Sequence, residues 1–332
     1  MSIARLERTA MTAPSTRAPA NPTTMRAARL GARGGPEAIV IERIPVPTLR
    51  DDDVLVGVRA AAITPSELGW LPTWTNPDGS ERAPTIPSHE LAGVVVAAGA
   101  AVRDLWAGMP VFGLADFYRD GAAAEHIAVH AADLADWPQS LDSVTAAALP
   151  LSGLTAWQAL FDHGHLLAGQ RVLVHGAAGG VGTFAVQLAH HEGAHVTAVA
   201  SARDGDFVRD LGADIVLDRQ APAFDAPARS MDLIIDTVGG DVLVRSWPLL
   251  AVDGRIVSIA PSSRSIADED PRGHFFVVTP DRGVLSELAR LVERGELRVI
   301  VERTFPLDET RQAYKFAQRE HPRGKVVLRI GD

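Results

Sequence analysis

The segment HGAAGGVG, residues 175–182, is the part of this sequence that most restricts how the chain folds. An apolar run at 171–174 precedes it, an amphipathic run at 183–190 follows it, and a second apolar run, HVTAVA, begins at 195. Glycines spaced by three allow a tight turn, an approach of bare backbone to an anion, and close packing of a helix on its strand. The pattern predicts a strand, turn, helix and second strand, with a phosphate bound where the helix begins.

This context fits a dinucleotide-binding turn better than a glycine-rich turn without a ligand, because strand, turn, helix and second strand follow in the expected order. We expect the pyrophosphate of the dinucleotide to meet the backbone of the turn. The residues predicted to make this contact are Gly176, Ala178, Gly179, Gly180, Val181 and Gly182.

The end of the second strand indicates which dinucleotide binds. NAD sites usually carry a carboxylate there, which hydrogen-bonds the ribose hydroxyls. Here the strand is followed by Ser201-Ala202-Arg203, and the first carboxylate is Asp204. A hydroxyl and a guanidinium suit a 2′-phosphate, since arginine binds phosphate through charge-assisted hydrogen bonds. We therefore predict NADP(H), with Ser201 and Arg203 at the phosphate; a solvated charge at a helix start is the alternative for Arg203.

The pattern of apolar residues divides the chain into stretches. Residues 25–149 contain short runs cut by Gly, Pro and Asp, which predict a β-rich domain. In residues 150–299 apolar runs alternate with helical segments, which predicts a parallel sheet with helices on both faces. A helix and a final strand in 300–332 can rejoin the first domain. Residues 1–24 are predicted as a disordered tail, with a targeting segment as the alternative.

Composition argues against several classes of protein. The formal net charge of −9 is unlike that of a nucleic-acid binder, which needs a basic face. No apolar run approaches the ~18 residues that a membrane-spanning helix needs, so we expect no membrane contact and a cytoplasmic location. The chain has no cysteine, which removes disulfides, thiolate nucleophiles and every zinc site built on sulfur.

Several motifs, in order along the chain, resemble the medium-chain dehydrogenase/reductase superfamily in its zinc-independent quinone oxidoreductase branch. The motifs are IPSHELAGVVVAAG (86–99), ALPLSGLTAWQAL (148–160), the glycine turn, VASARDGDFVRDLGAD (199–214) and RGKVVL (323–328). The resemblance spans about residues 25–330. It implies an α/β fold in which a GroES-like β-rich catalytic domain (25–149, joined by 300–332) adjoins a Rossmann doubly wound parallel sheet (150–299), with the active site in the cleft.

The sequence departs from the zinc-dependent relatives at all but one of their ligand positions. Those enzymes place a cysteine near residues 63–65, a histidine in a Gly-His-Glu motif, and a third ligand near 149–151. Here Thr64, Ser88-His89-Glu90 and Leu149-Pro150-Leu151 stand at these places. One imidazole cannot hold a catalytic zinc that takes three protein ligands, so no metal is predicted. Zinc held by His89, Glu90 and another side chain is the alternative.

A site without a Lewis acid suits a substrate that is already electrophilic. An α,β-unsaturated carbonyl accepts hydride at its β-carbon, and hydrogen-bond donors stabilise the enolate that forms; a quinone accepts hydride by similar logic. The candidate catalytic residues are Thr64, Trp70 and Tyr118. The alternatives are a Thr-Pro turn for Thr64, a core aromatic for Trp70 and an exposed loop tyrosine for Tyr118.

The resemblance implies further cofactor contacts and an assembly. Residues near the nicotinamide, its ribose and its carboxamide are implied to be Thr155, Val238, Gly239, Ile259, Ala260, Phe275, Phe276, Val277 and Lys325. A homodimer is implied through the sixth apolar run of the sheet, HFFVV (274–278). Two other functions stay open. One is a non-catalytic NADPH-binding sensor or structural protein. The other is an alcohol dehydrogenase, which the missing zinc ligands argue against.

Overall fold

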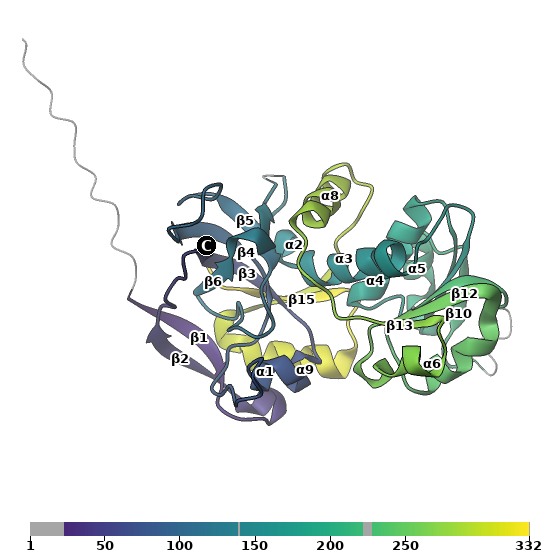
Figure 1. Ribbon diagram of the computed structural model, residues 1–332, viewed down its shortest axis with the longest axis horizontal. Coiled ribbons are helices and arrows are strands. Elements are labelled where there is room, and N and C mark those ends of the chain that lie inside the picture. The colour runs from purple at the N-terminus through teal and green to yellow at the C-terminus, as the bar shows by residue number, and fades with distance from the viewer. Residues whose placement is uncertain (1–22, 139, 222–227, 332) are drawn as a thin grey trace, which may run out of the picture.

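The computed structural model describes residues 23–138, 140–221 and 228–331, arranged around two large β-sheets (Figure 1). Residues 1–22 of the predicted tail lie outside the described residues. A two-stranded hairpin opens the described chain, formed by β1 (Thr24–Leu30) and β2 (Ile39–Pro45). The first strand pair begins with Thr24 opposite Pro45.

The β-rich half is a sheet with the order β14-β15-β3-β4-β5-β7, in which β6 also pairs with β3. Its strands pair antiparallel except for β14 with β15. The strands are β3 (Asp53–Ile63), β4 (Glu90–Ala98), β5 (Pro110–Leu114), β6 (His126–His130), β7 (Leu134–Asp136), β14 (Val301–Pro306) and β15 (Lys325–Arg329). The apolar runs at 53–63, 91–99 and 109–114 thus form strands as predicted.

The other half is a parallel sheet with the order β10-β9-β8-β11-β12-β13. This order, 3-2-1-4-5-6 within the sheet, is that of the doubly wound Rossmann fold, which confirms the predicted fold class. The strands are β8 (Arg171–His175), β9 (His195–Ala200), β10 (Ile215–Asp218), β11 (Met231–Asp236), β12 (Leu250–Ser258) and β13 (Gly273–Phe275). The last strand is shorter than the apolar run 274–278 that predicts it.

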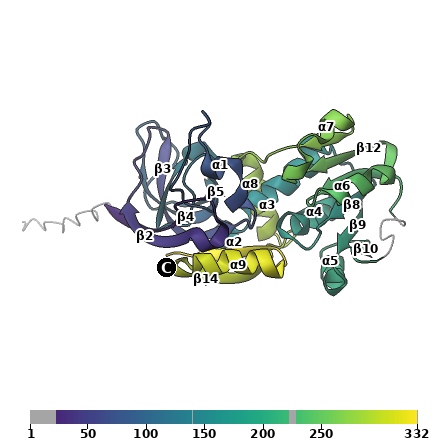
Figure 2. The ribbon, with the colours of Figure 1, turned by 90° about the horizontal axis from the view of Figure 1, so that it is seen from below.

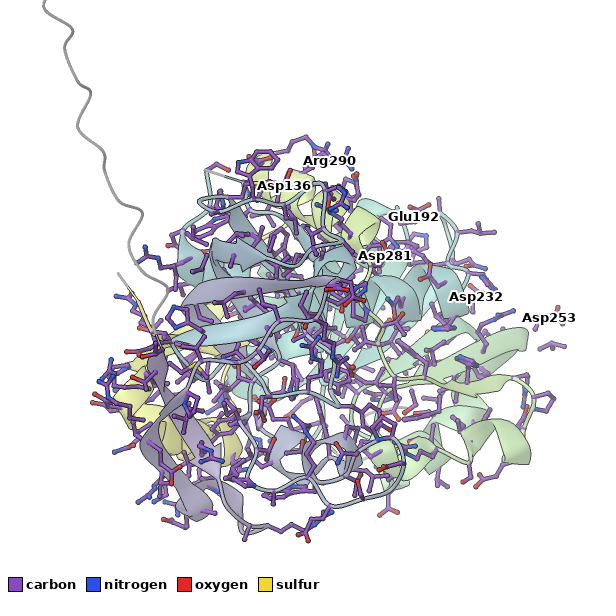
Figure 3. All side chains as sticks on the ribbon, turned by 60° about the vertical axis from the view of Figure 1, so that its left-hand side comes forward. Asp136, Glu192, Asp232, Asp253, Asp281 and Arg290 are labelled. Atoms are coloured by element: carbon purple, nitrogen blue, oxygen red, sulfur yellow. The ribbon has the colours of Figure 1, made fainter. Side chains whose placement is uncertain are left out.

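Helices cover the parallel sheet and fill the junction between the two halves (Figure 1). Those of the Rossmann half are α4 (Gly180–His191), α5 (Gly205–Asp210), α6 (Asp241–Ser246), α7 (Ile266–Glu269) and α8 (Arg282–Glu293). The others are α1 (Leu71–Trp74), α2 (Ser143–Ala147), α3 (Pro150–Trp157) and α9 (Thr310–Glu320). Asp281, labelled in Figure 3, caps α8 by accepting a hydrogen bond from the Val284 N–H at 2.9 Å. No helix in the described ranges has both the length and the apolar character needed to cross a bilayer.

The C-terminal segment returns to the β-rich half, where it adds β14 and β15 to the sheet. β15 pairs antiparallel with β3, with Val326 opposite Ile63, and α9 lies beside the hairpin strands in both ribbon views (Figures 1 and 2). One apolar core cluster runs through the junction, since it contains Phe112 of the β-rich sheet together with Leu154 of α3 and Val172 of the Rossmann sheet. Packing therefore fixes the two sheets against each other, and with them the segments that form the site.

Candidate nucleotide and substrate site

The turn after β8 needs glycine at two of the predicted positions. Gly176 has a φ of +68°, and a Cβ there would lie 2.3 Å from Thr237 Oγ1. At Gly182 a Cβ would lie 2.2 Å from the carbonyl oxygen of Gly176, so only glycine lets α4 pack this closely on the turn. The turn and the start of α4 therefore have the tight backbone geometry of a dinucleotide-binding turn.

The predicted contacts that follow β11, β12 and β13 lie at the same edge of the sheet as this turn, because parallel strands end together. Thr237 donates to the carbonyl oxygen of His175 at 2.9 Å, which joins the end of β11 to the end of β8. A Cβ on Gly239 would lie 2.7 Å from the Cβ of Ala260, so the loops after β11 and β12 touch. Val238 and Val277 are exposed there, whereas Phe276 is buried.

The catalytic half reaches the same turn through the start of β15. The Gly324 N–H donates to the Ala178 carbonyl at 2.9 Å, and a Cβ on Gly180 would lie 3.3 Å from the Lys325 Cδ. Lys325 forms a buried ion pair with Glu90, whose other carboxylate oxygen accepts the Leu151 N–H at 3.0 Å. Burial raises the pKa of Glu90 to about 7, although the charge of Lys325 works to lower it.

Thr155 lies on α3, one turn after Leu151, and is buried. Its Oγ1 donates to the Leu151 carbonyl at 2.5 Å, so the side chain is held against its own helix. The start of this helix faces the turn, since a Cβ on Gly180 would lie 3.1 Å from Ser152 Oγ. The structure thus brings α3, β15 and the glycine turn together.

Ser201 and Arg203 lie at the end of β9, and Arg323, which was not among the predicted residues, lies beside them. Ser201 Oγ donates to the carboxylate of Asp204, and Arg323 donates from Nε to the same carboxylate at 2.7 Å. Arg323 lies in the segment between α9 and β15, 120 residues from Arg203. No local pattern links the two positions, and only the return of the C-terminal segment brings them together.

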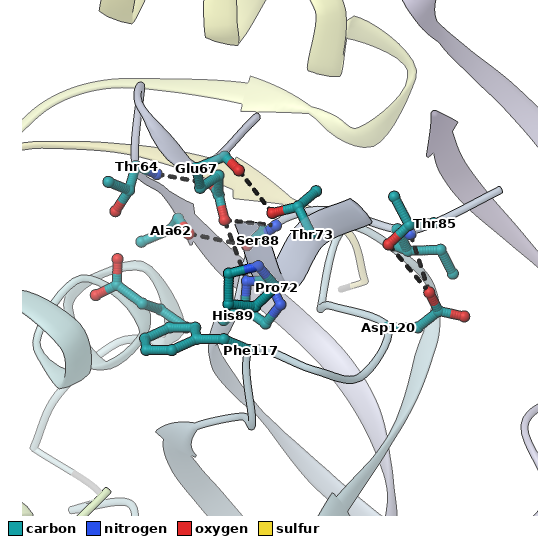
Figure 4. A network of polar contacts seen from close by, with 12 residues as sticks. Ala62, Thr64, Glu67, Pro72, Thr73, Thr85, Ser88, His89, Phe117 and Asp120 are labelled. Atoms are coloured by element: carbon teal, nitrogen blue, oxygen red, sulfur yellow. Dashed lines mark hydrogen bonds and ion pairs between the residues drawn. The ribbon is translucent and has the colours of Figure 1, made fainter. Parts of the chain in front are cut away.

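Beside the junction, a buried carboxylate organises the predicted substrate pocket (Figure 4). Glu67 accepts the Thr64 N–H at 2.9 Å, the Ser88 N–H at 3.0 Å and the phenol of Tyr314, and its Oε2 lies 3.2 Å from His89 Nδ1. Burial and the charge of Glu67 raise the pKa of Tyr314 well above its ordinary value. Four groups thus saturate one carboxylate, which holds the loop containing Thr64 to β4 and α9.

Aromatic side chains pack beside this carboxylate. The Phe117 ring makes edge-to-face contacts with Trp70 at 5.2 Å and with His89 at 5.3 Å between centroids. Tyr118 is the next residue and is partly exposed, and its backbone N–H donates to Asp116 at 2.9 Å. Trp70 and Thr64 therefore belong to one cluster around Glu67 and Phe117, whereas Tyr118 has an exposed side chain.

The donor set at the place where zinc-dependent relatives hold their metal does not fit a zinc ion. His89 has Nδ1 beside Glu67 and Nε2 3.3 Å from the Arg119 carbonyl oxygen, and Leu151 offers no donor in its side chain. Within the described part of the chain, no three His, Cys, Asp or Glu side chains are grouped closely enough to hold a metal. A catalytic zinc needs three protein ligands, which these residues do not supply.

Known proteins resemble this chain in sequence and in fold. Residues 50–139 match the model of the alcohol dehydrogenase GroES-like domain, and residues 211–328 match that of the zinc-binding dehydrogenase family. A probable mitochondrial zinc-binding oxidoreductase of Arthroderma benhamiae is 31% identical over 308 residues, which cover 86% of this chain and 91% of that protein. The chloroplastic NADPH-dependent alkenal/one oxidoreductase of Arabidopsis thaliana is 31% identical over 322 residues, 92% of this chain and 80% of that protein.

Among solved structures, the quinone oxidoreductase from Coxiella burnetii superposes with a TM-score of 0.87 at 28% identity, covering 92% of this chain and 99% of that one. These matches confirm the predicted pairing of a GroES-like β-rich half with a Rossmann half.

Proposed function

Since the chain belongs to the medium-chain dehydrogenase/reductase superfamily, in its zinc-independent quinone oxidoreductase-like branch, we propose that it uses NADPH to reduce conjugated carbonyls or quinones without a metal. It is an oxidoreductase with a nicotinamide cofactor. NADPH, the substrate class and the absence of zinc are the parts that we propose.

The observation that carries the proposal is the set of side chains at the place where zinc-dependent relatives hold their metal. Thr64, an engaged His89 and Leu151 stand where a Lewis acid would be held, so an alcohol has nothing there to stabilise it as an alkoxide. A substrate with a conjugated carbonyl needs only hydrogen-bond donors for the charge that moves onto its oxygen. The name of the Arabidopsis relative, an NADPH-dependent alkenal/one oxidoreductase, supports the same substrate class.

Each side chain near the site has a proposed task. When bound, the nicotinamide would supply hydride to the β-carbon of the substrate. The Thr64 hydroxyl, on a loop held by Glu67, would donate a hydrogen bond to the substrate oxygen or the nicotinamide ribose. Trp70 would form a wall of the pocket, and the Tyr118 phenol, at the exposed side, would return a proton to the substrate.

The backbone of the turn would bind the pyrophosphate, and the residues after β11, β12 and β13 would enclose the nicotinamide end. Ser201 and Arg203 would bind the 2′-phosphate, which favours NADPH over NADH.

A homodimer through β13 is also proposed, since β13 ends the strand order of the sheet and could pair with a second copy. Sedimentation velocity tests this directly, and a single monomeric species would contradict it. A cytoplasmic location stays a prediction.

A substrate panel tests the proposed chemistry. Purified protein, before and after dialysis against a chelator, is mixed with NADPH and an enone, a quinone or a saturated aldehyde, and separately with NADP⁺ and an alcohol. We expect NADPH oxidation with the enone or the quinone and none with the saturated aldehyde. Turnover of the alcohol that disappears on chelation would instead indicate a zinc alcohol dehydrogenase, and tight NADPH binding without any turnover would indicate a sensor.

A further inference from the structure

We propose that Gln158 is a positioning residue for the nicotinamide end of the cofactor, because its side chain holds the segment 276–281 that follows β13. The inference rests on the proposed function, and it concerns a residue that would act through the backbone of this segment. The segment leads from β13 to α8 (Figure 1).

The side-chain amide of Gln158 forms a closed pair of hydrogen bonds with one backbone residue of this segment. Its Nε2 donates to the Thr279 carbonyl at 2.8 Å, and its Oε1 accepts the Thr279 N–H at 3.2 Å. Gln158 is only 5% exposed, so the amide is enclosed by the protein. A donor and an acceptor that are both engaged by one residue specify a single position for Thr279.

The helical turn that begins at Gln158 holds the segment at a second point. This turn, Gln158–His163, follows α3 directly and has π-helical hydrogen bonding, which is often found at functional sites. Its last residue, His163, packs on Phe276 with 4.4 Å between the ring centroids. One turn therefore fixes both Phe276 and Thr279, and with them the short stretch between these residues.

The segment lies at the ligand edge of the parallel sheet, because it follows the carboxyl end of β13. The glycine turn and the end of β9 would serve the adenosine half of a dinucleotide, so the ends of β11, β12 and β13 would serve the nicotinamide half. Val277, between the two fixed residues, is 51% exposed. Gln158 also lies one helical turn after Thr155, and it therefore joins the helix that carries Thr155 to this segment.

Gln187 makes the same kind of contact at another place and is the matched control. From α4 its Nε2 donates to the Arg298 carbonyl at 3.0 Å, its Oε1 accepts the Arg298 N–H at 2.8 Å, and it is 6% exposed. Arg298 lies in the segment between α8 and β14. Gln187 is two turns along α4 from Gly180, about 10 Å by the rise of an α-helix, so its loss should leave the nicotinamide undisturbed.

Two ligands separate positioning of the nicotinamide from a general loss of structure. NADPH and 2′-phospho-ADP-ribose, which is NADP without its nicotinamide, are titrated calorimetrically into wild type, Gln158→Leu, Gln158→Asn and Gln187→Leu. We expect Gln158→Leu to weaken NADPH binding about fivefold or more and to leave the affinity for the fragment within about twofold. Its kcat with an enone should fall about tenfold or more, because a misplaced nicotinamide transfers hydride poorly.

The other two variants complete the test. Gln158→Asn keeps both polar groups of the amide on a shorter side chain, so it should recover part of kcat; if Gln158→Leu does not fold, Gln158→Asn is judged by the same comparison. Gln187→Leu should lower the urea midpoint about as much as Gln158→Leu, because it loses the same two bonds, and should change neither affinity nor kcat.

Unchanged kcat and NADPH affinity in Gln158→Leu, or equal weakening of NADPH and the fragment, would overturn the inference and leave the proposed reductase intact. Absence of enone and quinone turnover by wild type would overturn the proposed function, and the two affinities would still decide the role of Gln158.

Discussion

The ammonium group of Lys325 forms an ion pair with the carboxylate of Glu90, and the two side chains are only 4% and 1% exposed. The pair joins β15 to β4, and Glu90 also holds the N–H of Leu151 at the start of α3. Because Lys325 at the same time packs against the glycine turn, one buried pair ties the nucleotide turn to the catalytic half.

This pair gives the stability of the protein a definite pH dependence. The pKa of Glu90 is raised from 4.5 to about 7 by burial, so the native state holds its proton more tightly than the unfolded chain. The contribution of Glu90 to the free energy of unfolding therefore falls as pH rises from about 4.5 to about 7. Lys325→Met removes the cation that lowers this pKa, and we expect the fall to continue above pH 7.

Urea unfolding at pH 6, 7 and 8 measures this difference. Lys315→Met is the matched control, because Lys315 pairs with Glu37 on the surface and its loss should leave the pH profile parallel to that of the wild type. Parallel pH profiles of the unfolding free energy for wild type and Lys325→Met would show that Lys325 does not lower the pKa of Glu90.

Gly182→Ala should weaken the binding of both nicotinamide nucleotides. The new Cβ would lie 2.2 Å from a backbone oxygen of the turn, so α4 must move away from the position that presents its N–H groups. We expect at least a tenfold weaker binding of NADPH and NADH alike, measured by fluorescence titration. Gly31→Ala, where a Cβ would meet nothing within 4 Å, should leave both affinities unchanged. Wild-type affinity in Gly182→Ala would contradict the placement of the pyrophosphate.

Much of this arrangement was predictable from the sequence, because the glycine turn and the alternation of strands and helices are local patterns. They predicted the Rossmann sheet, the β-rich half and the returning C-terminal strand. The Glu67 cluster was missed, since nothing near Glu67 in sequence shows that Ser88, His89 and Tyr314 converge on it. Arg323 was missed for the same reason, as its neighbours at the end of β9 are remote in sequence.

Asp53→Asn tests a second ion pair, which holds the loop that contains Tyr118 and Arg119. Asp53 is fully buried and accepts two hydrogen bonds of 2.7 Å from Arg119, whose own carbonyl faces His89. We expect a loss of about 3 kcal/mol in the free energy of unfolding at pH 7, because Arg119 is left without its partner. Asp52→Asn is the control, because the Asp52 carboxylate is exposed and its loss should hardly change the free energy of unfolding.

The effect of Asp53→Asn should shrink in acid. Burial works to raise the pKa of Asp53, but the bonds from Arg119 and the Arg50 N–H outweigh it and hold the pKa below 3.8. Its stabilisation is present above that pH and is lost as pH falls through the lower, native-state pKa. Urea unfolding curves at pH 7 and near pH 3 measure the change, and an unchanged difference between variant and wild type would contradict an ionised Asp53.

Tyr314→Phe tests whether the Glu67 cluster positions Thr64. The change removes one of four hydrogen-bond partners of a buried carboxylate and should cost about 2 kcal/mol of unfolding free energy, the usual value for a bond to a charged group. We expect kcat with an enone to fall while NADPH affinity stays constant. Phe316 lies on the same helix but packs on Phe305. Phe316→Leu should therefore lower the free energy of unfolding without changing kcat. A Tyr314→Phe enzyme with full kcat would show that the cluster is only structural.

Hydride delivery to the β-carbon is the central claim, and isotope transfer tests it most directly. NADPH carrying deuterium at both C4 positions is turned over with a simple enone on chelator-treated protein, and the product is analysed by NMR. We predict one deuterium at the β-carbon of a saturated ketone, formed in equal amount to the NADP⁺. Deuterium at the carbonyl carbon of an alcohol, or no labelled product from protein that binds NADPH, would contradict the account.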